Sequence, residues 1–144
     1  MKRFLPDTSC LVATVCSWHE HHRATADELA RRARQREEIV MAAPALIETY
    51  AVLTRLPPPY RLRPADALAV MEGSWSHAEV VALAATEIWP FLRGLPDPGI
   101  AGGSTYDAVI AACARKAGVD VILTWNVDHF ERVSEGLEVR PPRA

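Results

Sequence analysis

The sequence predicts an α/β fold with a mainly parallel sheet. Short apolar runs typical of buried strands alternate along the chain with longer segments of helical periodicity. A length of 144 residues is that of one domain, and 49% hydrophobic residues are enough for a single core. The charged fraction of 24% and the net charge of -2 exclude a disordered chain, a coiled coil and a polycation that coats nucleic acid. We therefore expect one domain over residues 1–144.

The chain is expected to begin with a short strand and two helices. The strand covers residues 4–5 and ends just before Asp7. Thr8 or Ser9 can cap an apolar helix that continues to about residue 17. The periodicity of residues 17–36 predicts an amphipathic helix. Its arginines are expected to lie mostly outside: Arg31, Arg32, Arg34 and Arg36.

The middle of the chain is expected to form a strand over 39–42, helices over 45–56 and 64–75, and a strand or buried segment over 80–83. After it we expect a helix over 85–92, a loop over 96–103, a helix over 104–116, a strand over 119–124 and an edge strand over 137–139. Prolines and a glycine set several of these limits. Pro44 and Pro64 open helices, and residues 57–59 break the chain. Pro90 interrupts one helix, and Gly118 closes another.

Three long apolar segments each contain one carboxylate and no base. The acids stand alone as follows: Asp7 within residues 4–19, Glu48 within 39–54 and Asp107 within 98–114. At 24% charged residues, a window of this length carries about four charges. Burying a lone carboxylate is costly unless it is hydrogen-bonded or bound to a cation. The three acids therefore indicate one shared site, and oxygen donors favour Mg²⁺ or Mn²⁺ over zinc.

Each carboxylate also has a purely structural explanation. Asp7 could simply cap the first helix. Asp107 completes the segment Ser104-Thr105-Tyr106-Asp107, which has the S-x-x-D form of a capping box. Glu48 could be an exposed residue on a half-buried helix.

Histidines and a tryptophan are further candidates for chemistry. The cluster His19-Glu20-His21-His22 allows a zinc interpretation, because histidines three apart can share a helix face. No distant Cys or His forms a partner pair at metal spacing, which disfavours zinc. His22 is expected at a helix junction, and Trp125 beside the expected site could stack on a base.

Four segments together resemble the PIN-domain nucleases. Asp7-Thr8-Ser9 resembles the opening motif of that family, residues 44–53 its second motif and residues 105–114 its third. Residues 123–130 resemble the closing T-x-[ND]-x-x-[DH]-F segment. The resemblance spans residues 3–140, and the compact length resembles the VapC-type toxins of bacterial toxin–antitoxin pairs.

The resemblance implies a three-layer α/β/α sandwich with a mainly parallel sheet of four or five strands. It implies an endoribonuclease that depends on Mg²⁺ or Mn²⁺ and hydrolyses phosphodiester bonds of RNA. A small antitoxin protein restrains such a toxin, which is commonly a homodimer. Carried over by motif, the metal-binding and catalytic carboxylates are Asp7, Glu48 and Asp107.

The fourth motif departs from the family pattern. Asn126 stands where many relatives have an aspartate, so one negative charge is missing and a second metal is expected to bind more weakly. Asp128 could compensate or could lie on the surface, and His129 precedes Phe130. The sequence leaves open whether Asp128 or His129 joins the site.

Supporting roles fall to hydroxyl and basic side chains. Ser9 and Thr124 could orient a carboxylate or a phosphate, or could be ordinary turn and strand-end hydroxyls. Arg115 and Lys116 could contact the RNA backbone, although cations are favoured at any helix C-terminus.

Two other classes of protein compete with the nuclease. A non-catalytic α/β signalling domain such as a phospho-acceptor receiver also gathers acids at strand ends, but it needs an acidic pair after the first strand and a late lysine, both missing here. A degenerate PIN domain acting through protein interaction is kept open by Asn126.

The sequence also predicts a cytoplasmic protein. The N-terminal apolar run is too short for a signal peptide, and no apolar stretch reaches the length of a membrane span. Three cysteines without a CxxC motif favour a reducing compartment over a disulfide framework.

Overall fold

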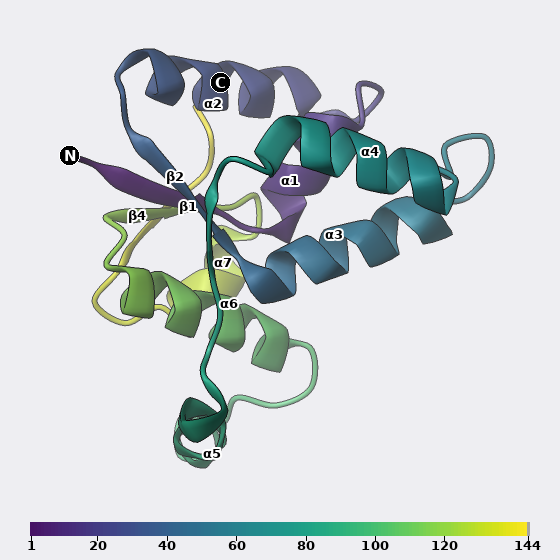
Figure 1. Ribbon diagram of the computed structural model, residues 1–144. Helices are drawn as coiled ribbons and strands as arrows, with labels where there is room; N and C mark the ends of the chain where they lie inside the picture. Colours follow the sequence, from purple (N-terminus) through teal and green to yellow (C-terminus); the bar gives the residue numbers. More distant parts are fainter. Residues whose placement is uncertain (144) are drawn as a thin grey trace.

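A five-stranded sheet in the order β3-β2-β1-β4-β5 forms the centre of the computed structural model, which describes residues 1–143 (Figure 1). The strands are β1 (Arg3–Pro6), β2 (Glu38–Ala42), β3 (Glu79–Val81), β4 (Val121–Leu123) and β5 (Glu138–Arg140). All four neighbouring pairs are parallel. The predicted parallel sheet of four or five strands is confirmed.

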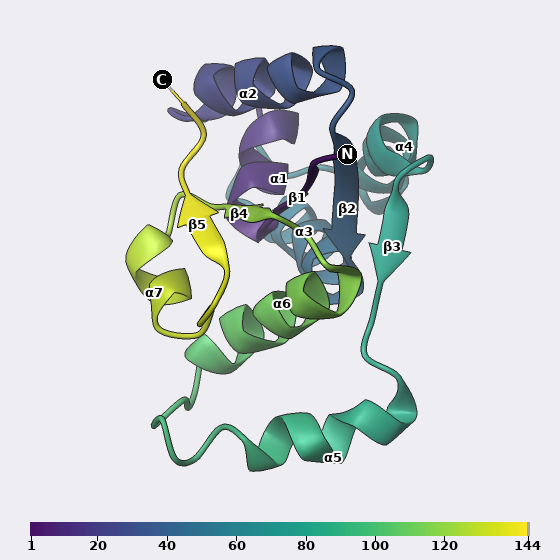
Figure 2. The same cartoon turned by 90° about the vertical axis from the view of Figure 1, so that its left-hand side faces the viewer.

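The helices connect these strands, as parallel pairing requires. They are α1 (Thr8–Val15), α2 (His22–Arg34), α3 (Ala43–Arg55), α4 (Pro64–Trp75), α5 (Ala85–Arg93), α6 (Ser104–Ala117) and α7 (Val127–Glu131). Figure 2 shows α1, α2 and α4 on one side of the sheet and α6 on the other, with α5 beyond α6. The α/β/α sandwich is therefore confirmed.

Alternation along β1 explains why helices cover both faces. Phe4 packs with Val121, Leu123 and Leu29 of α2. Leu5 belongs to the main core, which contains Ile122 and the buried face of α6. Because successive side chains of a strand point to opposite faces, each short strand supplies apolar groups to two cores.

The N-cap of the first helix lies one residue before Thr8, the earlier of the two expected caps, which confirms the alternative that Asp7 caps this helix. Asp7, and not Thr8 or Ser9, is the N-cap of α1, and its carboxylate accepts a hydrogen bond from the backbone N–H of Cys10. The helix ends at Val15 because Cys16 adopts an extended conformation. The predicted helix over 17–36 therefore begins only at His22, and residues 16–21 form turns.

Arg32 corrects the prediction that the arginines of this helix lie mostly outside. Its guanidinium is buried, with a hydrogen bond of 2.8 Å to Glu28 and one of 2.7 Å to Glu37. It also lies over the ring of Phe4, 5.2 Å from the centroid. Two carboxylates and an aromatic face offset the cost of burying this charge.

Three smaller differences concern strands and a proline. The predicted strand over 119–124 shortens to β4, and that over 80–83 becomes the edge strand β3. Pro90 lies inside a continuous α5 and does not interrupt it. Within residues 1–143, every helix is too short or too polar to span a membrane.

Candidate active site

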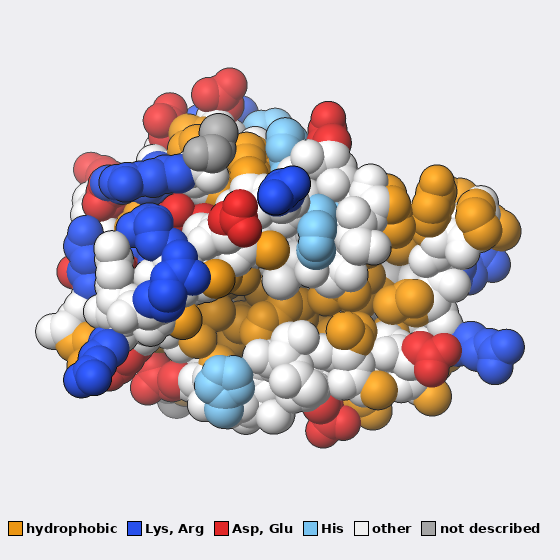
Figure 3. All heavy atoms as spheres, turned by 90° about the horizontal axis from the view of Figure 1, so that it is seen from above, with side chains coloured by type: hydrophobic (Ala, Val, Ile, Leu, Met, Phe, Trp, Pro, Cys, Tyr) orange, Lys and Arg blue, Asp and Glu red, His pale blue; other side chains and the backbone are white. Residues whose placement is uncertain are grey.

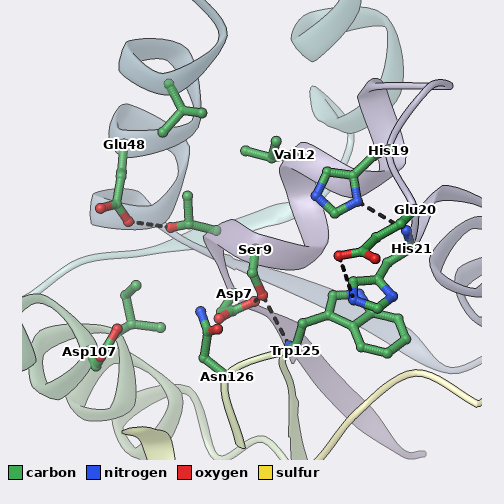
Figure 4. Close-up of a pocket in the computed structure, with 13 residues that line it drawn as sticks. Asp7, Ser9, Val12, His19, Glu20, His21, Glu48, Asp107, Trp125 and Asn126 are labelled. Atoms are coloured by element: carbon green, nitrogen blue, oxygen red, sulfur yellow. Dashed lines mark hydrogen bonds and ion pairs between the residues drawn. The ribbon is translucent and has the colours of Figure 1, made fainter. Parts of the chain in front are cut away.

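A cavity of about 480 Å³ opens where β1 and β4 end, and all three isolated carboxylates line it (Figure 4). Asp7 follows β1, Glu48 lies on α3, and Asp107 lies in the first turn of α6. Carboxyl ends of parallel strands are where α/β folds bind ligands. Segments separated by 100 residues thus contribute acids to one cavity.

Asp7 is a buried carboxylate whose two oxygens both accept hydrogen bonds. Oδ1 accepts from the Ser9 hydroxyl at 2.6 Å and from the Cys10 backbone at 3.0 Å. Oδ2 accepts from the Thr124 hydroxyl at 2.6 Å. Burial raises the pKa of Asp7 to about 6, while these hydrogen bonds oppose the rise. Without a cation, this carboxylate is harder to ionise than an ordinary aspartate.

The two hydroxyls that hold Asp7 are themselves held by backbone. Ser9 Oγ accepts from the N–H of Trp125 at 3.0 Å, and Thr124 Oγ1 accepts from the N–H of Asn126 at 2.9 Å. The structure thus places both predicted orienting residues, Ser9 and Thr124, on the carboxylate. This network joins the start of α1 to the segment after β4.

Glu48 is half-buried and has a hydroxyl partner. Thr8 Oγ1 donates a hydrogen bond of 2.6 Å to Glu48 Oε1 (Figure 4). Thr8 follows the residue that caps α1, so α1 positions Glu48 as well as Asp7. Because Glu48 is half-buried, the alternative of an exposed residue on a half-buried helix is wrong.

Asp107 does not cap its helix. The N-cap of α6 is Gly103, and the Ser104 hydroxyl donates to the carbonyl of Ala101, so the capping-box alternative is wrong. Burial raises the pKa of Asp107, nearby His129 lowers it, and Glu48 raises it. Asp107 therefore lies close enough to Glu48 for their charges to repel.

The fourth motif contributes Asn126 and not Asp128. Both residues are exposed, but Asn126 lines the cavity and Asp128 lies outside its lining. His129 on α7 is the group of this segment whose charge acts on Asp107. The charge missing at Asn126 is therefore not replaced by Asp128.

Arg115 and Lys116 lie outside the lining of the cavity, so their contact with the RNA backbone stays a prediction. The Arg115 guanidinium donates to the carbonyl of Val133. Lys116 donates to the carbonyl of Ala82 at 3.0 Å and pairs with Glu87. Both residues close the C-terminal end of α6, where cations are favoured.

Sequence reasoning considered three residues of the opposite wall only as part of a disfavoured zinc cluster and did not expect them at the cavity. His19, Glu20 and His21 line it, and the His21 ring stacks on Trp125 with centroids 3.8 Å apart (Figure 4). The signal was present as a run of histidines, but that run was assigned to a helix, whereas it forms turns that reach the site. His22 points elsewhere, with Nδ1 2.9 Å from the carbonyl of Ala13.

The donor set of the cavity suits a hard divalent cation. Its lining contains carboxylate and amide oxygens and neither Lys nor Arg. Across residues 1–143, however, no three His, Cys, Asp or Glu side chains stand close enough together to hold one ion. An ion held by all three carboxylates would require the side chains of Glu48 and Asp107 to turn towards Asp7.

Comparison with known proteins agrees with this architecture. Residues 4–136 match the PIN domain family. The chain belongs to the PIN-domain family. It is 38% identical over 137 residues to Ribonuclease VapC40 of Mycobacterium tuberculosis, covering 93% of this chain and 96% of that protein.

Solved structures of PIN proteins show the same fold. The crystal structure of Mycobacterium tuberculosis VapC20, a sarcin-ricin loop cleaving toxin, superposes with a TM-score of 0.73 at 22% identity and covers 96% of this chain and 99% of that chain. The structure of VapBC-1 from nontypeable Haemophilus influenzae gives a TM-score of 0.68 at 16% identity, covering 96% and 97% of the two chains.

Proposed function

We propose that this PIN domain, formed by residues 1–144, is a metal-dependent endoribonuclease and the toxin of a type II toxin–antitoxin pair. The observation that carries this proposal is the gathering of Asp7, Glu48 and Asp107 around one cavity whose lining contains neither Lys nor Arg. Identity of 38% to Ribonuclease VapC40 over nearly the full length supports RNA as the substrate.

The reaction is hydrolysis of a phosphodiester bond. Water oxygen bonds to phosphorus, the bond from phosphorus to the leaving oxygen breaks, and that oxygen gains a proton. Asp7, Glu48, Asp107 and the amide oxygen of Asn126 would hold Mg²⁺ or Mn²⁺, which supplies charge stabilisation and lowers the pKa of water.

The chain's own residues prepare this site. Ser9 and Thr124 fix both oxygens of Asp7, and Thr8 fixes one oxygen of Glu48. Asp107 carries no such restraint among the hydrogen bonds of the described side chains and has a raised pKa, so it is suited to accept a proton from the attacking water.

The partners of this chain are an RNA substrate, a cognate small antitoxin and a second copy in a homodimer. An apolar groove between α3, α5 and α6 supports a protein contact, with exposed Ile47, Ile88 and Tyr106 in its lining. All three cysteines are free and buried, which supports a reducing cytoplasm as the site of action.

The test is cleavage of RNA by the purified chain with and without divalent metal. We expect cleavage with Mg²⁺ or Mn²⁺, none with EDTA, and loss to background in Asp107→Asn with an unchanged circular dichroism spectrum. Asp97→Asn is the matched control, because Asp97 is exposed and lies outside the cavity lining. Undiminished cleavage by Asp107→Asn would show that the carboxylate cavity is not the active site.

A degenerate PIN domain acting through protein contact is the second candidate. It is favoured by Asn126 in place of an acid. It is also favoured because, among residues 1–143, no three potential ligands stand close enough to hold one ion. Calorimetric titration separates the two. Absence of binding at millimolar Mg²⁺ and Mn²⁺ supports the degenerate domain, whereas binding that Asp7→Asn abolishes supports the ribonuclease.

A further inference from the structure

A row of five rings leads from the carboxylate cavity to the loop between α3 and α4. It consists of Trp125, His21, His19, Trp18 and Tyr60, and we call it the aromatic row. We infer that the aromatic row binds unpaired bases of an RNA strand whose backbone enters the cavity. This inference rests on the proposed ribonuclease function and adds to its cavity a surface that binds the bases of the substrate.

The rings follow one another at contact distance. From the cavity outwards, successive centroids are 3.8 Å apart between Trp125 and His21, 5.7 Å between His21 and His19, 5.9 Å between His19 and Trp18, and 4.3 Å between Trp18 and Tyr60. Only the innermost pair is stacked in parallel, at 9°, and the others are tilted. The row therefore offers ring faces in several orientations.

The inner end of the row is fixed to the site. The Trp125 indole N–H donates to the Thr25 hydroxyl at 2.8 Å, and its backbone N–H donates to Ser9, which in turn donates to Asp7. His21 donates its backbone N–H to Nδ1 of His19 at 3.0 Å. A base on the inner rings would thus be held at a set distance from the carboxylates.

The outer end of the row is exposed. Trp18 is 47% exposed and Tyr60 is 44% exposed, and together with Pro59 they line a small hollow of about 260 Å³. Figure 3 shows hydrophobic side chains gathered at the right-hand end of the molecule, where Figure 1 places the loop between α3 and α4. Two exposed rings in contact form a patch, and exposed apolar patches mark binding surfaces, whereas a single exposed ring is common.

The exposed basic residues next to members of the row in the sequence suit a nucleic acid backbone. Arg61 follows Tyr60, Arg63 lies two residues further, and Arg23 follows the histidines, all three exposed. Glu20 is the opposing charge and pairs with His21 at 3.6 Å. Aromatic rings with flanking arginines are the composition of single-strand binding sites, whereas a duplex hides its base faces.

The test compares binding and cleavage in ring variants. With EDTA present, fluorescence anisotropy of a labelled 12-nucleotide RNA reports binding without chemistry. We expect Trp18→Ala and Tyr60→Ala each to weaken binding by about fivefold or more, and Trp18→Phe to restore it. We expect an RNA duplex of the same sequence, and an oligomer with abasic sites, to bind as weakly as the Ala variants.

Trp89→Ala is the matched control, because Trp89 is 66% exposed on α5 and stands outside the row. Wild-type affinity of Trp18→Ala and Tyr60→Ala, or an equal loss in Trp89→Ala, would overturn the inference. So would unchanged RNA binding with weakened antitoxin or dimer contact, which would assign the row to a protein.

A second substrate distinguishes failure of the aromatic-row inference from failure of the proposed ribonuclease function. Hydrolysis of the small diester bis(4-nitrophenyl) phosphate involves the cavity alone. We expect Trp18→Ala to raise KM for single-stranded RNA and to leave hydrolysis of the small diester unchanged. If wild type and Trp18→Ala have equal KM values for RNA, the base-binding role of the row is wrong and the ribonuclease proposal stands. If the wild type hydrolyses neither substrate, the ribonuclease proposal is wrong.

Discussion

The hydroxyl of Thr124 donates a hydrogen bond of 2.6 Å to Oδ2 of Asp7, although 117 residues separate the two in the chain. Thr124 also accepts from the N–H of Asn126, so one hydroxyl joins two residues of the cavity. The hydrogen bond is buried, and a buried donor or acceptor that loses its partner reduces the free energy of unfolding by about 1–3 kcal/mol.

Replacing this hydroxyl should weaken both the fold and the site. Thr124→Val keeps the shape and removes the donor, so we expect a loss of about 1–3 kcal/mol in the free energy of unfolding. The pKa of Asp7 should rise further, moving the acid limb of the rate profile to higher pH. Thr124→Ser keeps the donor and should retain the wild-type profile in urea unfolding and cleavage assays.

Asp7 makes the stability of the metal-free protein depend on pH. Its pKa is about 6 in the folded chain and near 3.8 in the unfolded one, so the folded state binds this proton more tightly. Stability from this group is therefore complete below pH 3.8 and is lost as pH rises to about 6, by about 3 kcal/mol at most. Urea unfolding of wild type and Asp7→Asn across this range isolates the effect, because other groups titrate in both. Parallel stability curves for the two proteins would contradict it.

Asn126→Asp restores the fourth acid of the family motif. Asn126 lines the cavity with Asp7 and Asp107, so the substitution adds a negative charge beside the other donors. We expect a lower Kd for Mn²⁺ by calorimetry and lower stability of the metal-free chain, because like charges repel. Asp128→Asn is the control and should leave the Kd unchanged, since Asp128 lies outside the lining.

The buried Arg32 should be sensitive to the loss of one partner. Arg32→Met removes one partner of the buried Glu28 and leaves that carboxylate only its pair with Arg31, so the free energy of unfolding should fall by about 1–3 kcal/mol. The double variant Glu28→Gln with Arg32→Met should recover much of that loss. Arg34→Met is the control on the same helix, because Arg34 is exposed, and should change stability by less than about 0.5 kcal/mol.

Two glycines should respond with opposite signs to alanine. Gly118 ends α6 with a φ of 66°, a left-handed conformation, so Gly118→Ala should cost about 1 kcal/mol. Gly73 lies in α4 with nothing within 4 Å of an added Cβ, so Gly73→Ala should stabilise the protein by about 0.5–1 kcal/mol. Thermal unfolding of both variants measures the difference, and a shared sign would refute the assignment.

Fold class and the gathering of three acids could be predicted because both depend on local patterns. Strand-length apolar runs fix the layers, and a lone acid such as Glu48 in an apolar helix stands out against its neighbours. The environment of those acids could not be predicted. Thr124 bonds to Asp7 only because β4 pairs with β1, which is a property of strand order.

The errors have physical causes of the same kind. The periodicity of its helix predicts an exposed Arg32. Its burial depends on Glu37 and on Phe4 of β1, which lie outside that helix. The histidines read as helical, whereas the chain turns after Cys16 and brings His19 and His21 to the cavity. Local periodicity contains no information about such contacts between distant segments.

The position of β1 between β2 and β4 has a consequence during synthesis. Asp7, Glu48 and Asp107 all leave the ribosome before residues 121–126. That later segment contains β4, which pairs with β1, and Thr124, which donates a hydrogen bond to Asp7. Domains assemble as units once their segments are available. A growing or prematurely terminated chain that stops before residue 121 thus carries every acid of the cavity and still lacks the assembled site.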